Sequence, residues 1–101
     1  MQYPHSLAFS KTRKEIFVSD KWNHCVHIFS SEGEFLKSIW HGKLRSPEGI
    51  AMGPNEELVI CDTGNDRVVI VNPETEELIY TIGSGKTKYI YQRAWQFMEA
   101  M

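Results

Sequence analysis

Residues 47–71 read PEGIAMGPNEELVICDTGNDRVVIV, and residues 4–29 read PHSLAFSKTRKEIFVSDKWNHCVHIF. The two segments align so that Asp20 falls on Asp62, at an offset of 42 residues. Repeats with a period of about 40–50 residues are typical of the blades of β-propellers. The sequence therefore predicts two copies of one structural unit.

Each copy contains four short apolar segments separated by residues that favour turns. Strands separated by so few residues pair antiparallel, because a parallel crossover needs about a dozen residues or more. Each copy is therefore predicted to be a four-stranded antiparallel meander, which is one propeller blade. The predicted strands are Ser6–Ser10, Glu15–Ser19, Val26–Ser30 and Phe35–Trp40 in the first copy, and Gly49–Met52, Glu57–Cys61, Val68–Asn72 and Leu78–Ile82 in the second.

The predicted fold class is all-β, with two propeller blades and a short C-terminal helix. The blades span about residues 4–41 and 47–83 within a domain of residues 1–85, and the tail covers residues 86–101. Apolar residues recur in this tail at helical spacing. We expect the helix either to cover a blade face or to bind a partner.

Composition excludes several functional classes. The 101 residues carry 11 Lys and Arg against 13 Asp and Glu, so bulk positive charge cannot drive binding to nucleic acid or membranes. No apolar run approaches the roughly 20 residues that cross a bilayer, and the N-terminus lacks the pattern of a secretion signal. Two cysteines cannot form a disulfide framework. These features predict a cytoplasmic protein with no membrane partner.

The second copy resembles the NHL repeat of six-bladed β-propellers. The matching residues are Pro47, Gly49, Ile50, Ala51, Asp62, Asn65, Arg67 and Val68. The first copy departs from this motif, with Ser6 in place of glycine and Cys25 in place of arginine. The resemblance implies a larger propeller, and blades bury their faces against neighbouring blades. Further blades are expected from a longer parent chain or from other copies of this chain, for example in a trimer.

A recurring polar motif follows the second strand of each copy. Asp20 and Asn23 in the first copy correspond to Asp62 and Asn65 in the second. Such side chains bond nearby backbone N–H groups in turns, and Arg67 can pair with an aspartate across the turn. We predict a structural role for this motif.

The predicted ligand-binding face lies where the turn between strands two and three meets the connector to the next blade. The residues expected there are Lys21, Trp22, His24, Lys43 and Arg45. Cationic side chains beside an aromatic suit single-stranded RNA, and the same residue types anchor protein interfaces. NHL propellers of the TRIM-NHL class bind RNA or protein on this face, so the resemblance implies the same two classes of partner.

The sequence indicates a non-catalytic binding scaffold without a cofactor. It has no assembled nucleophile and base, and Cys25 and His27 supply at most two metal ligands on one strand face. The alternative is a fragment of a propeller enzyme. The segment Pro4–Ala8 is similar to a stretch of the zinc-dependent peptidyl-amidating lyases, which implies His5 as a candidate zinc ligand.

Overall fold

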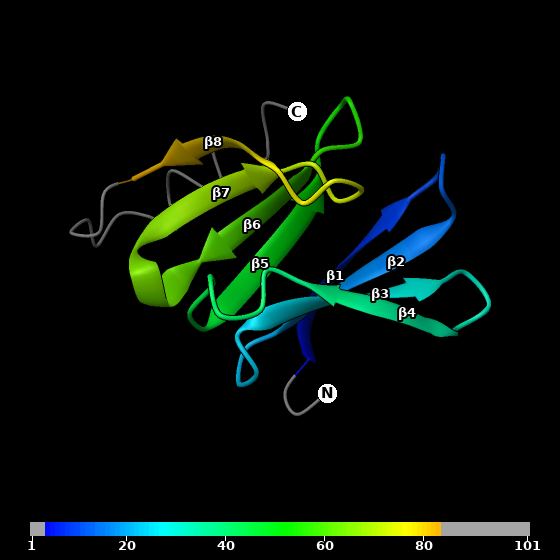
Figure 1. Cartoon of the computed structure of the whole chain (residues 1–101), viewed down its shortest axis with the longest axis horizontal. Coiled ribbons are helices and arrows are strands. Elements are labelled where there is room, and N and C mark those ends of the chain that lie inside the picture. Colours follow the sequence, from blue (N-terminus) through cyan, green and yellow to red (C-terminus); the bar gives the residue numbers. More distant parts are fainter. Residues whose placement is uncertain (1–3, 84–101) are drawn as a thin grey trace.

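The computed structural model describes residues 4–83, which form two four-stranded antiparallel sheets (Figure 1). Strand order follows the chain in both sheets. The first sheet contains β1 (Pro4–Ser10), β2 (Glu15–Asp20), β3 (Cys25–Ser30) and β4 (Phe35–Ile39). The second contains β5 (Pro47–Met52), β6 (Leu58–Asp62), β7 (Arg67–Val71) and β8 (Leu78–Ile82), with the short 3₁₀ helix η1 (Thr63–Asn65) between β6 and β7.

The prediction of two four-stranded blades is confirmed. We call β1–β4 the first blade and β5–β8 the second blade. The observed strand ends differ from the predicted ones by at most two residues. Strand β6, for example, begins at Leu58 instead of Glu57 and includes Asp62. The predicted C-terminal helix lies outside the described residues.

The two blades pack through alternate side chains of their strands. Phe17 lies between Ala8 and Ile28 in the antiparallel register of the first blade, and all three are buried toward the second blade. Side chains on a strand alternate between faces, so this face collects every second residue. Strand β5 lies against β1 and β2.

The core between the blades is apolar and tightly closed. Its buried members are Ala8, Phe17, Val26, Ile28, Ile39, Trp40, Leu44, Ile50, Leu58, Ile60, Val69 and Val71. Burying one such large aliphatic side chain contributes about 1.5–3 kcal/mol. The second blade also buries Val59, Cys61, Val68 and Ile70 on its opposite face.

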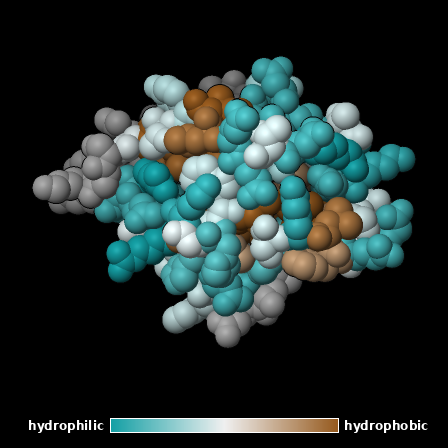
Figure 2. Space-filling view, viewed as in Figure 1, coloured by the Kyte–Doolittle hydropathy of each residue, from teal (hydrophilic) through white to brown (hydrophobic). Residues whose placement is uncertain are grey.

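The first blade exposes apolar residues on the face that points away from the second blade. Leu7, Phe9 and Phe35 are 67%, 46% and 57% exposed. Figure 2 shows brown, apolar surface over the part of the molecule that contains the first blade. By the repeat offset, Leu58 and Ile60 of the second blade correspond to Ile16 and Val18 of this face, and both are buried against the first blade. This face is therefore covered by the first blade in the second copy, whereas among residues 4–83 it is open in the first copy.

No helix within residues 4–83 has the length and apolar character required to span a membrane.

Candidate binding site

Asp62 anchors the connector between the blades. Its side chain is fully buried at the end of β6. One carboxylate oxygen accepts the backbone N–H of Arg45 at 2.6 Å. The other accepts Asn65 Nδ2 at 2.9 Å and Arg67 Nε at 2.7 Å. A buried carboxylate is costly unless it is paired and hydrogen-bonded, and these three donors meet that need.

Asp20 occupies the same position in the first blade but has a different cationic partner. It is also fully buried, and it accepts hydrogen bonds from the backbone N–H of Asn23 at 3.3 Å and from Asn23 Nδ2 at 2.8 Å. Where the second blade has Arg67, the first has Cys25, and His27 Nε2 donates to Asp20 Oδ2 at 2.8 Å instead. Ser38 Oγ lies 2.7 Å from His27 Nδ1. His27 therefore takes the place of the repeat's arginine.

This histidine is a residue that sequence reasoning missed. From the sequence, Cys25 is a departure from the repeat and His27 only a possible metal ligand on the same strand face, so its pairing with Asp20 was not predicted. The available signal was spacing, because His27 lies two residues after Cys25 and so shares its face. The Cys25 Sγ atom lies 3.7 Å from His27 Nε2.

Hydrogen bonds hold the connector from both sides. Gly64 N donates to Arg45 O at 2.7 Å, and Ser46 N donates to His24 Nδ1 at 2.9 Å. The approach to η1 is so close that a Cβ atom on Gly64 would lie 2.5 Å from Arg45 O. Arg67 also donates to Lys43 O at 2.9 Å. The connector backbone is therefore fixed before any ligand arrives.

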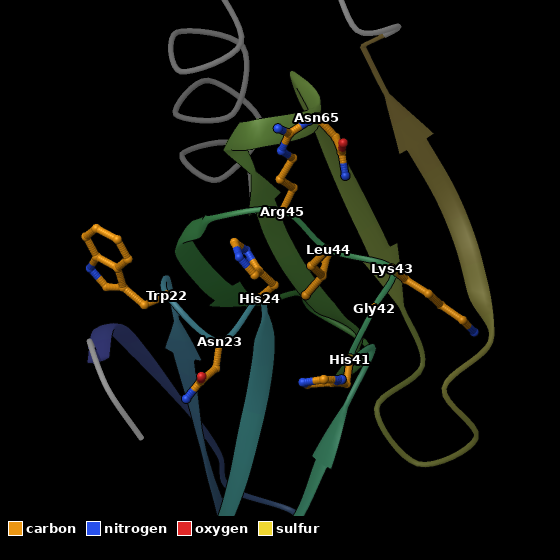
Figure 3. A pocket seen from close by; sticks show the side chains of 9 residues that line it. All are labelled: Trp22, Asn23, His24, His41, Gly42, Lys43, Leu44, Arg45 and Asn65. Carbon is orange, nitrogen blue, oxygen red and sulfur yellow. The ribbon is translucent and has the colours of Figure 1, made fainter.

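A pocket with a volume of about 540 Å³ lies between the β2–β3 turn and this connector. Figure 3 shows the rings of His24 and His41 in the hollow, Arg45 extending toward Asn65, and Trp22 on the opposite rim. Trp22 is 62% exposed. The described residues that line it are Trp22, Asn23, His24, His41, Gly42, Lys43, Leu44, Arg45 and Asn65.

Four of the five predicted face residues line this pocket, namely Trp22, His24, Lys43 and Arg45. Lys21 does not, because its Nζ atom forms an ion pair with Glu48 Oε2 at 2.9 Å. The Lys43 ammonium lies 5.2 Å from the centre of the Trp40 ring, and it points away from the hollow in Figure 3.

Trp40 belongs to the core. The indole N–H donates to Glu76 O at 2.8 Å, and the ring is buried between the blades. Lys43 is thus a rim residue whose charge is partly engaged by an aromatic ring.

The described residues that line the pocket include no carboxylate. The aspartates of the two turns, Asp20 and Asp62, are buried and paired with His27 and Arg67. The side chains that line the hollow are therefore hydrogen-bond donors, cations, an aromatic ring and a leucine. This set can bind an anionic group next to an apolar or planar one.

The cysteines do not form a reactive site. Burial raises the pKa of the Cys61 thiol to about 11. Burial, together with the nearby Asp20 charge, also raises the pKa of Cys25. The thiolate is the nucleophilic form, so these environments suppress it at neutral pH.

The Nδ1 atom of His5 lies 3.3 Å from Glu48 O. Among residues 4–83, no three His, Cys, Asp or Glu side chains are grouped so that they could hold a metal ion. The zinc-lyase interpretation would need every ligand other than His5 to come from outside these residues. These residues alone do not fit a zinc centre.

The comparisons with known proteins agree with the geometry. A family profile described as "NHL repeat" matches residues 1–29 and 44–71, which together cover more than half of the chain. The chain belongs to the NHL repeat family. The matched ranges contain the aspartate of each blade, so the turn motif of Asp20 and Asp62 is part of the repeat. Comparison with curated proteins finds no match.

One solved structure similar to this NHL chain is that of a protein of unknown function from Bacteroides caccae. The TM-score is 0.65 at 15% sequence identity, and the match covers 81% of this chain. The chain spans 29% of the length of that protein. At this identity the likeness shows the fold alone.

Proposed function

We propose that this NHL chain is a non-catalytic binding scaffold, whose ligand is a protein segment or single-stranded RNA. The observation that carries the proposal is the convergence of Trp22, His24, Lys43 and Arg45 on one pocket. The connector is held by Asp62, Gly64 and His24, so little conformational entropy is lost there on binding. The ligand lies on the face formed by the inter-blade connector and the β2–β3 turn.

We also infer that the scaffold includes further blades. The supporting observation is the open face of the first blade, where Leu7, Phe9 and Phe35 are exposed. The corresponding face of the second blade packs on the first blade. The additional blades come from a longer parent chain or from other copies. The cytoplasmic location stays a prediction, with which the free thiols of Cys25 and Cys61 are consistent.

The test combines binding and stability of Trp22→Ala. The probes are a random single-stranded RNA dodecamer and a random heptapeptide library, each applied to the full 101-residue chain. We expect the wild-type chain to retain at least one probe. An anchoring aromatic contributes about 1–3 kcal/mol, so the variant should bind that probe about 5- to 150-fold more weakly. Its melting temperature should be unchanged.

Titration with salt separates the two partner classes. Phosphate contacts make the logarithm of RNA affinity fall linearly with the logarithm of salt concentration. Loss of melting temperature with unchanged probe binding would assign Trp22 to packing and contradict the proposed face. Failure of the wild-type chain to retain either probe would contradict the scaffold function itself.

A further inference from the structure

The pocket presents two donors on a connector and a turn that hydrogen bonds hold in place. His24 Nδ1 accepts the Ser46 N–H, so the ring proton of His24 is on Nε2, which is then a donor. Arg45 adds a guanidinium whose backbone is held at both its N–H and its carbonyl. Donors held in this way complement a carboxylate or phosphate oxygen.

Among residues 4–83, the positively charged surface around this pocket extends over few side chains. Lys21 is neutralised by Glu48, and Lys43 lies over Trp40. The equivalent turn of the second blade carries Asp66 where the first has His24. Single-stranded RNA is bound by grooves that follow several successive phosphates and stack several bases. Asp66 would repel a chain of phosphates that continued past the second blade, whereas His24 and Arg45 next to Trp22 suit a single anionic group.

We propose that the ligand of this pocket is an acidic peptide segment. A glutamate or aspartate carboxylate accepts hydrogen bonds from His24 Nε2 and the Arg45 guanidinium. A neighbouring apolar side chain of the peptide packs on Trp22 at the rim. The proposal rests on the proposed function, since it names the ligand of the same site.

The experiment compares two heptapeptide libraries that differ only at the central position, which is glutamate in one and glutamine in the other. A random single-stranded RNA dodecamer is the third probe. Each is applied to the immobilised full chain, to Arg45→Gln and to Lys37→Gln, and Trp22→Ala is included to report binding at the pocket. Lys37 is an exposed residue of β4 outside the pocket lining, so its variant removes the same charge elsewhere. Thermal melting establishes that all four proteins are folded.

We expect the wild-type chain to retain the glutamate library about tenfold more than the glutamine library, as charge-assisted hydrogen bonds predict. Arg45→Gln should remove this preference and Lys37→Gln should keep it. Equal retention of both libraries would overturn the acidic-peptide proposal, and so would preferential retention of the RNA. In either case, weaker retention by Trp22→Ala would leave the scaffold function standing. Retention of no probe would overturn both.

Discussion

Asp20 and Asp62 are both fully buried carboxylates at the same position of the repeat, yet they are paired with different side chains. Arg67 approaches Asp62 from the first residue of β7, whereas His27 approaches Asp20 from the third residue of β3. Both donors lie on the same face of their strand, so the sheet offers two positions for one function. In both copies the buried aspartate has a side-chain hydrogen-bond donor from the next strand. The identity and the exact position of that donor differ between the copies.

The change Asp62→Asn tests this requirement. An asparagine keeps the shape but loses the charge, and its amide N–H₂ faces the donors of Asn65 and Arg67. We expect the free energy of unfolding to fall by about 2–3 kcal/mol, because a buried pair is broken while the arginine keeps some access to water. Urea unfolding followed by fluorescence measures it.

Asp66→Asn is the matched control. Asp66 lies in the same turn, is only partly buried, and has a left-handed backbone at φ 50° that asparagine also tolerates. It should change stability by less than about 0.5 kcal/mol. Equal losses for the two variants would show that the buried aspartate contributes nothing specific.

Among the elements, the strands could be predicted from the sequence and the contacts between blades could not. Alternating apolar residues and turn residues are local signals, and all eight strands were placed from them. The ion pair of Lys21 with Glu48 and the burial of Trp40 under the β7–β8 turn depend on how one blade sits on the next. A repeat pattern carries no information about such pairs.

The candidate site also has a part that the sequence predicts and a part that depends on contacts between blades. The end of the blade at which Trp22, His24 and the connector meet follows from the meander, so the pocket could be predicted in outline. The hydrogen bond from Ser46 to His24, which sets the ring's orientation, depends on the path of the connector. The sequence assigned Lys21 to the binding face. The ion pair of Lys21 with Glu48 could not be predicted, because it depends on how the second blade lies against the first.

The turns at the other end of the molecule are joined by Glu56. Its carboxylate accepts hydrogen bonds from Thr12 N at 3.0 Å and Ser10 Oγ at 2.8 Å. Hydrogen bonds from Thr12, and then from Ser10, lower the pKa of Glu56. Because the β5–β6 turn thereby holds the β1–β2 turn, this contact links the two blades at the end opposite the pocket.

Glu56→Gln should reduce the pH dependence of stability in acid. A carboxyl group with a lowered pKa in the folded state stabilises the protein above its unfolded pKa, about 4.3 for glutamate. This contribution is lost as pH falls through the folded pKa. We therefore expect the urea midpoint of the wild-type chain to fall more than that of the variant between pH 5 and pH 2.

Glu32→Gln, at an exposed position of the β3–β4 turn, is the matched control and should keep the wild-type profile. Parallel wild-type and Glu56→Gln curves across the acid range would show that Glu56 does not link the turns in solution.

At the scale of the molecule, the two blades differ in one equivalent face, which is covered in the second blade and open in the first among residues 4–83. The core joins the Phe17 face of the first blade to the Leu58 face of the second. The face of the first blade that corresponds to Leu58 and Ile60 presents Leu7 and Phe9 to solvent. Exposed apolar sheet faces of this kind mark interaction surfaces. The pairing of the two blades shows which kind of surface fits there, namely the Phe17-type face of another NHL blade.

The 101-residue chain should therefore associate in solution through this face. We expect sedimentation equilibrium to show a mass that rises with protein concentration in the micromolar range. The double change Leu7→Thr and Phe9→Thr should reduce the association, because it removes apolar area while keeping residues that favour strands. Ser10 and Ala8, on the other face of β1, keep the contact with the second blade unchanged.

The associated mass identifies the source of the neighbouring blade. A discrete species of three chains indicates a closed ring of six blades, as cyclic symmetry permits. An open series of larger species indicates a face that is normally covered by a blade of a longer chain. The inference that another blade covers this face would be contradicted by a wild-type chain that remains at 11.7 kDa and does not bind a dye specific for exposed apolar surface. Such a chain would have no exposed apolar face that requires a further blade.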